Sequence, residues 1–337
     1  MSDAVSYRLL VAVLMGVVVA LFGLSLTVGP AGIAFGDSLN ALFVGGEGDS
    51  AREAVVLVMR EIRLPRALLG LGVGASLGLS GAVLQGLLRN PLAEPGLLGV
   101  SASASLGAVL AIYTGLSAMF PLALPLMALG GAFAAVVLVQ AMTGSGGTLT
   151  IILAGVAVSS FAGAMTSLAL NLSPNPFAAL EIVFWMLGSL ADRSMTHVWI
   201  AGPFILAGCA MLLMQGRALD TLTLGNDAAR SLGTDMARVR LMAVLGTAIA
   251  VGASTAVTGA IGFVGLVVPH LLRPLVGAVP SRLLPASALG GAAMILAADI
   301  AVRLLAPGRD LKLGVLTAII GAPFFLWLVH RARKEAA

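Results

Sequence analysis

The chain has 337 residues, of which 59% are hydrophobic and 10% are charged, and its mean hydropathy is +1.06. No soluble domain could bury so much apolar surface, so lipid must be the main solvent of this protein. The formal net charge of +4 at pH 7 does not indicate a nucleic-acid partner, because the basic residues stand singly between apolar segments.

The apolar segments are too long for the strands of a membrane β-barrel, which run about ten residues and alternate apolar with polar. Most approach the roughly 20 residues that a helix needs to cross the bilayer. We therefore expect an all-α membrane protein with about ten transmembrane helices, forming a single permease domain over residues 1–337. In chain order the expected helices are 9–28, 67–88, 95–113, 121–142, 149–170, 197–216, 239–259, 261–279, 283–303 and 313–330. Pro269 and Pro274 interrupt the eighth of these, because proline removes a helical hydrogen bond.

Three loops are longer than a simple connection requires. Residues 29–66 end in a basic cluster, residues 217–238 are polar with helical character, and residues 171–195 predict a short surface helix. Lys and Arg residues of the loops are more numerous on the side that holds the N-terminus, and such an excess marks the cytoplasmic face. We therefore expect 29–66 and 171–195 outside the cell membrane and 217–238 inside.

ATP hydrolysis can be tested from the sequence, because a phosphate-binding loop of the GxxxxGK[ST] type needs a lysine followed by Ser or Thr. The chain has two lysines, and they precede Leu313 and Glu335. Its three histidines are far apart and lack the spacing of metal ligands, and its single cysteine lies in an apolar segment. The sequence therefore predicts neither an enzyme nor a cofactor site, and any use of ATP must involve another polypeptide.

Asp299 is the clearest ionisable residue inside an expected helix, where such a group is costly and seldom without a role. It stands four residues before Arg303, so the two side chains can pair on one face near the outer end. A structural ion pair and a functional role for Arg303 both remain open. Few other carboxylates lie within the helices, which argues against an ion-coupled secondary transporter but keeps it as the alternative class.

Small residues recur at every fourth position of the second expected helix and give it one smooth face. They are Gly70, Gly74, Gly78, Ala82 and Gly86. Such a face lets another helix approach closely. Tight helix packing is the favoured interpretation, and a groove for substrate is the other.

Five segments form a distinctive series along the chain. They read RLPRALLGLGVGASLGLSGAVLQGLLRNPLAEPGLLGVSASASLGA (63–108), FWMLGSL (184–190), LTLGNDAARSLG (222–233), GAIGFVGLVVPHLLRPLVG (259–277) and LGVLTAIIGAPFFLWLV (313–329). Together they resemble the permeases of ABC importers for iron-siderophores, haem and vitamin B12, the family often called FecCD or BtuC-like. The resemblance covers nearly the whole chain.

The resemblance implies a ten-helix subunit in the bacterial inner membrane that pairs with a second permease subunit, here expected to be an identical copy. It also implies two cytoplasmic ATPases, which hold ATP and Mg, and a periplasmic substrate-binding protein. Arg63, Arg66 and Arg303 match positions where such permeases engage carboxylates of the binding protein, and charge-assisted pairs would fix its orientation.

On the inner side, Asn90, Pro91 and Leu92 match the segment that closes the pathway in the family. Residues 217–238 correspond to its coupling helices, which lie in a groove of the ATPase. The implied coupling residues are Leu222, Leu224, Gly225, Asn226, Asp227, Ala229, Leu232 and Gly233. Asn226 and then Asp227 depart from the acidic residue usual after LG, and Lys312 stands where relatives usually carry proline.

The resemblance leaves the substrate open. An iron chelate, either haem or a ferric siderophore, is favoured because it is the more frequent substrate in the family. Vitamin B12 (cobalamin) is the alternative.

Overall fold

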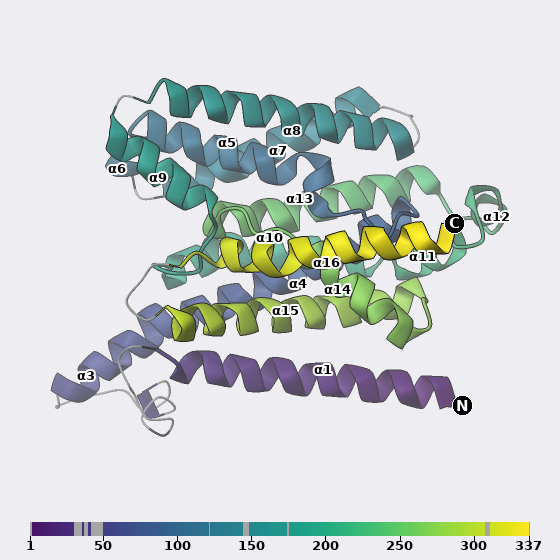
Figure 1. Ribbon diagram of the computed structural model, residues 1–337, viewed down its shortest axis with the longest axis horizontal. Coiled ribbons are helices and arrows are strands. Elements are labelled where there is room, and N and C mark those ends of the chain that lie inside the picture. Colours follow the sequence, from purple (N-terminus) through teal and green to yellow (C-terminus); the bar gives the residue numbers. More distant parts are fainter. Residues whose placement is uncertain are drawn as a thin grey trace.

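The computed structural model describes residues 2–29, 36, 40–41, 50–120, 122–143, 148–173, 175–306 and 311–336. Part of the predicted loop 29–66 lies outside the described residues. The described chain is helical and the longer helices run roughly parallel (Figure 1). The elements are α1 (Ser2–Thr27), α3 (Ser50–Leu57), the π-helical η1 (Val58–Arg63), α4 (Leu64–Leu87), the 3-10 helix η2 (Pro95–Leu98), α5 (Val100–Tyr113), α6 (Leu116–Met119), α7 (Ala123–Thr143), α8 (Thr148–Asn171), α9 (Pro176–Met186), α10 (Met195–Leu213), α11 (Gly216–Leu222), α12 (Asn226–Ser231), α13 (Met236–Thr258), α14 (Val264–Leu272), the 3-10 helix η3 (Arg273–Val276), α15 (Pro280–Leu305) and α16 (Leu313–Ala336).

Helices occupy all ten predicted windows, but two windows are broken. Within the described residues, seven helices are long and apolar enough to cross a membrane. The window 95–113 divides at Gly99, whose φ of 75° lies in the left-handed region and ends η2 before α5 begins. The window 261–279 divides into α14 and η3, which together are shorter than the roughly 20 residues that a crossing needs.

The predicted surface helix in 171–195 is confirmed as α9. Asn175 caps it, because the Asn175 side chain accepts a hydrogen bond from the backbone N–H of Ala178 at 2.9 Å.

Helices α4 and α13 form the centre of the bundle. Helix α4 contacts α1, α10, α13, α14 and α15, and α13 contacts α4, α5, α7 and α10. The glycine face of α4 allows this packing: the backbone of Gly74 lies against the carbonyl of Gly291 on α15, and Gly78 lies against Ser287. A Cβ atom at Gly74 would stand only 2.7 Å from the Cα of Ala292. The predicted packing role of the small-residue face is confirmed.

Large apolar side chains cover the outside of the bundle. Phe133, Trp199 and Leu206 are 71%, 72% and 71% exposed, as expected for surfaces in contact with lipid. Both termini and α12 lie at one end of the bundle, and α3 lies at the other (Figure 1). This arrangement matches the predicted placement of the N-terminus and residues 217–238 on one side.

Candidate functional sites

The outer ends of α4 and α15 meet at a buried carboxylate. Asp299 on α15 is 1% exposed. Arg66 on α4 donates from Nε to the two carboxylate oxygens at 2.9 and 3.1 Å, and its Nη2 lies 2.8 Å from Oδ1. Arg303 places Nη2 2.9 Å from Oδ2. One carboxylate therefore holds two guanidinium groups, and the predicted pairing of Asp299 with Arg303 is confirmed.

Arg63 and Arg303 also cap the end of α1, and with Arg66 and Asp299 they form what we call the arginine cluster. A helix leaves its last four carbonyl groups without helical partners, and cations near that end are stabilising. Arg63 Nη1 donates to the carbonyl groups of residues 26 and 27 at 2.8 and 2.9 Å. Arg303 Nη1 donates to the carbonyl groups of Ser25 and Val28 at 2.8 and 2.7 Å, and its Nη2 donates to Ser25 Oγ at 2.6 Å. The cluster therefore ties α1, α4 and α15 together.

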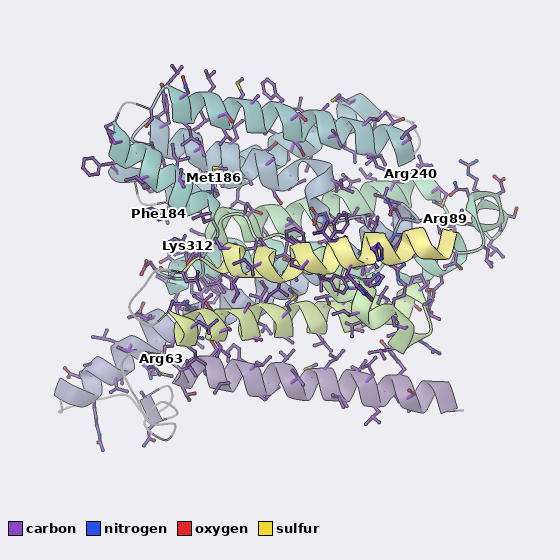
Figure 2. All side chains as sticks on the ribbon, viewed as in Figure 1. Arg63, Arg89, Phe184, Met186, Arg240 and Lys312 are labelled. Carbon is purple, nitrogen blue, oxygen red and sulfur yellow. The ribbon has the colours of Figure 1, made fainter. Side chains whose placement is uncertain are left out.

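The three arginines predicted to dock a binding protein thus lie at one end of the molecule, and Figure 2 shows Arg63 at the end opposite Arg89 and Arg240. Arg63 is 4% exposed, and the side chains of Arg303 and Arg66 are 8% and 17% exposed. Arg63 Nη2 contacts no acceptor among the described residues. An incoming carboxylate would therefore meet Arg66 most readily and would compete with the carbonyls of α1 for the others. The docking role stays a prediction.

The segment predicted to form the inner gate is a fixed turn. Asn90 Oδ1 accepts from the backbone N–H of Leu92 at 2.9 Å, as in an Asx turn, and Pro91 fixes its own φ. Asn90 and Pro91 are exposed, whereas Ala93 is fully buried and anchors the turn. The geometry is that of a rigid exposed turn, and its role as a gate stays a prediction.

Sequence reasoning missed a polar link beside this turn. The Gln85 side chain donates to the carbonyl of Gly265 at 3.2 Å, and Arg273 Nη2 donates to Gln85 Oε1 at 2.6 Å. These bonds join the inner end of α4 to α14 and η3. The signal was present, because a glutamine within an apolar helix is costly unless it has partners.

The predicted coupling residues divide by exposure. Leu224 and Leu232 are 68% and 63% exposed, which suits contact with another protein. Leu222 and Ala229 are 1% and 0% exposed and pack in the main core, so they hold α11 and α12 in place instead of presenting a surface. The remaining predicted coupling residues lie in the same segment and are Gly225, Asn226, Asp227 and Gly233. Coupling to an ATPase stays a prediction.

Two polar contacts attach this segment to long helices. Asp220 Oδ1 accepts from the backbone N–H of Ser281 at 2.8 Å, in the first turn of α15, where a negative charge is favourable. The hydroxyl groups of Thr221 and Thr234 lie 2.9 Å apart and join α11 to the start of α13. Sequence reasoning missed both contacts.

An outer groove of about 420 Å³ lies between α9 and the residues that lead into α16. Its aromatic walls are Phe177, Phe184 and Trp185, and its charged walls are Glu181, Asp192, Arg193 and Lys312. Lys312 Nζ lies 5.4 Å from the ring centre of Phe184, a cation–π distance, and Figure 2 labels both residues. Burial lowers the pKa of Arg193, and the charge of Asp192 partly offsets this.

Comparisons with known proteins identify the family. A sequence model of the FecCD transport family matches residues 13–331. The hemin transport system permease protein of Yersinia pestis is 38% identical over 85% of this chain and 87% of its own length. The vitamin B12 import system permease protein of Klebsiella pneumoniae is 40% identical over 82% of this chain and 83% of its own length.

The fold agrees with these relatives. A solved structure of a protein assigned to the metal-chelate type of ABC transporter, in an inward-facing conformation, superposes with a TM-score of 0.83. It is 33% identical, and the match covers 95% of this chain and 98% of that one. The alternative of an ion-coupled secondary transporter is therefore set aside. The chain is a multi-pass permease subunit, not itself an ATPase, of an ABC importer for iron-chelate or vitamin B12 class substrates, and it belongs to the FecCD transport family.

Proposed function

We propose that this permease carries an iron chelate, either haem or a ferric siderophore, from the periplasm to the cytoplasm. The haem and vitamin B12 relatives are similarly identical to the chain, so identity does not separate the substrates. The outer groove is the observation that favours an iron chelate. Its aromatic walls suit a flat conjugated ligand, and its cations Arg193 and Lys312 suit carboxylate or catecholate groups.

Cobalamin remains the alternative substrate. Its side chains carry amides where haem carries carboxylates, so it would gain less from Lys312. The family resemblance implies a proline at the position of Lys312, so Lys312 is a residue by which this chain would differ from other members in substrate preference.

The energy for transport comes from partner subunits. Two cytoplasmic ATPases bind ATP and Mg²⁺, while this chain holds no cofactor. The ATPases contact the exposed side chains of Leu224 and Leu232. When ATP binding and hydrolysis displace the coupling segment, the displacement reaches α15 through the hydrogen bond between Asp220 and the backbone of Ser281. A periplasmic binding protein delivers the substrate to the arginine cluster.

A second, identical permease subunit completes the pathway. It packs against the side formed by α9 and α16, where large apolar side chains such as Phe184 and Ile319 are 50% and 62% exposed. An apolar cavity of about 640 Å³ between α16 and the end of α9 would then lie along the path. Weak apolar walls suit transport, because a strong site would retain the substrate.

The test is uptake into liposomes by the permease reconstituted with its ATPase and binding protein. Haem, a ferric siderophore and cobalamin are compared with and without ATP. We expect ATP-dependent uptake of an iron chelate. Lys312→Gln should raise the KM for that chelate about 10-fold, the value of one charge-assisted hydrogen bond, and Lys312→Arg should preserve it.

Two further results would separate the parts of the proposal. Arg63→Glu combined with Arg66→Glu should abolish uptake, because it reverses the charge at the docking arginines and also removes their bonds to Asp299 and to the end of α1. Uptake of cobalamin alone would overturn the proposed substrate while leaving the docking prediction intact. Equal effects of Lys312→Gln on all three substrates would show that Lys312 does not select among them.

A further inference from the structure

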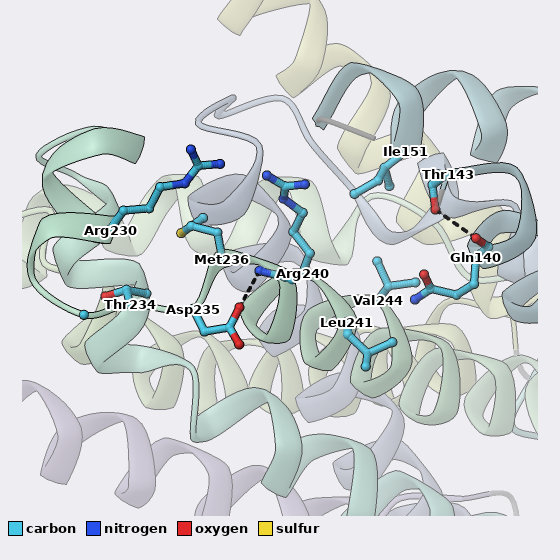
Figure 3. A pocket seen from close by; sticks show the side chains of 12 residues that line it. Gln140, Thr143, Ile151, Arg230, Thr234, Asp235, Met236, Arg240, Leu241 and Val244 are labelled. Atoms are coloured by element: carbon cyan, nitrogen blue, oxygen red, sulfur yellow. Dashed lines mark hydrogen bonds between the residues drawn. The ribbon is translucent and has the colours of Figure 1, made fainter. Parts of the chain in front are cut away.

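A cavity of about 690 Å³ opens at the inner end of the molecule, between the residues around α12 and the ends of α7 and α8. Arg230 from α12 and Arg240 from α13 both line it, and Figure 3 shows their side chains rising on the same side of the first turn of α13. Arg230 lies in the predicted coupling segment 217–238, and Gly233, one of the implied coupling residues, also lines the cavity, whereas Arg240 stands beyond that segment. We propose that this cavity binds the headgroup phosphate of an anionic phospholipid from the cytoplasmic leaflet.

The charges of the cavity suit an anion. Asp235 is its acidic lining residue, and Asp235 Oδ1 accepts hydrogen bonds from the backbone N–H groups of Ala237 and Arg238 at 2.9 and 3.1 Å. This carboxylate is therefore engaged in capping α13. The two guanidinium groups present planar arrays of donors, which match the oxygens of a phosphate.

The apolar surroundings favour a lipid over a soluble phosphate or an acidic protein loop. Buried Ile151 and Val244 line the cavity, together with Leu241, which is 40% exposed. Nearby in the chain, Met142 at the end of α7 and Leu149 at the start of α8 are 54% and 68% exposed. Acyl chains would cover the exposed Leu241, Met142 and Leu149 while the phosphate reaches the arginines, whereas inorganic phosphate would leave these three side chains uncovered. Basic pockets between helices on the cytoplasmic side are suited to anionic headgroups.

The proposal can be tested on the isolated full-length permease by native mass spectrometry after release from nanodiscs of phosphatidylglycerol, of phosphatidylcholine, or of an equal mixture. We expect retention of phosphatidylglycerol in preference to phosphatidylcholine. Arg230→Gln with Arg240→Gln should lower the affinity for phosphatidylglycerol roughly 30-fold, since each arginine near the membrane surface contributes about a factor of five. The Lys double variant, Arg230→Lys with Arg240→Lys, should retain most of the binding.

Arg238→Gln is the matched control, because Arg238 is exposed in the same turn but does not line the cavity. Equal loss of phosphatidylglycerol in Arg238→Gln would overturn the proposal, since it would indicate general surface charge. Displacement of the lipid by inorganic phosphate at millimolar concentration would overturn the lipid source. Unchanged lipid retention in the Gln double variant, together with weaker binding of the ATPase, would instead assign the cavity to the ATPase contact.

Discussion

Replacing Asp299 with asparagine should destabilise the permease strongly. The carboxylate is 1% exposed and holds Arg66 and Arg303 at distances of 2.8 to 3.1 Å. Removing one partner of a buried ion pair costs about 3–5 kcal/mol, because the other charge stays buried and uncompensated. The lower end applies here, since Arg303 keeps its acceptors on α1 and Arg66 can turn toward water. The entropy of unfolding is about 0.7 kcal/mol per degree for a chain of this size, so a loss of about 3 kcal/mol should lower Tm by about 4 °C.

The measurement is thermal unfolding of the purified permease in detergent, followed by the fluorescence of its three tryptophans. Asp227→Asn, which alters an exposed carboxylate on α12, is the control and should shift Tm by less than about 1 °C. Arg66→Gln added to Asp299→Asn should cost less than the sum of the single changes, because the pair is coupled. A Tm for Asp299→Asn within 1 °C of the unmodified chain, or simple additivity, would refute the reasoning.

Three other outcomes follow from particular contacts. Gly74→Ala should lower Tm and the yield of monodisperse protein, because the new Cβ would overlap the backbone of α15. Gly72→Ala is the control and should be tolerated, since the nearest neighbours of its Cβ would be side-chain atoms of Ile205 at 3.6 and 3.8 Å. Asp220→Asn should lower substrate uptake per ATP hydrolysed several-fold in proteoliposomes while ATPase activity persists; equal loss of both would point to a general folding defect. Burial raises the pKa of Glu94, so the folded chain binds this proton more tightly than the unfolded chain, and stability should fall as pH rises from the ordinary carboxyl range through the raised pKa. Glu94→Gln should flatten the corresponding decline in Tm as pH rises above the ordinary carboxyl range; an unchanged slope would contradict this assignment.

Local spacing predicted the contacts that lie within one helix or along one face. The four-residue separation of Asp299 and Arg303 was sufficient to predict their pairing, and the glycine repeat of α4 was sufficient to predict close packing. The helix that packs against the glycine face of α4 was not predictable, because the sequence of α4 does not indicate which other helix approaches it. Arg66 was missed as a ligand of Asp299 for the same reason, since the two residues are 233 positions apart.

Contacts to backbone carbonyl groups are even harder to predict from the sequence than contacts between side chains. Arg63 and Arg303 cap α1 through carbonyl groups, which every residue carries, so no residue type marks the contact. The coupling segment shows a related limit. Leu222 and Leu224 are the same residue type two positions apart, yet one is buried and the other is exposed, because α11 ends between them. The motif does not show where α11 ends, so it could not indicate that only one of these two leucines is exposed.

Helix α15 connects the two ends of the permease. Its first turn holds Asp220 through Ser281, and near its last turn Asp299 and Arg303 bind Arg66 and the end of α1. The 18 residue-to-residue steps from Ser281 to Asp299 span about 27 Å, close to the thickness of the hydrocarbon core. The close backbone contact with α4 along this length means that α15 cannot tilt without moving α4 as well. A displacement of the coupling segment would therefore reach the arginine cluster through two packed helices, and the same contacts would carry the effect of a docked binding protein back to the ATPase side.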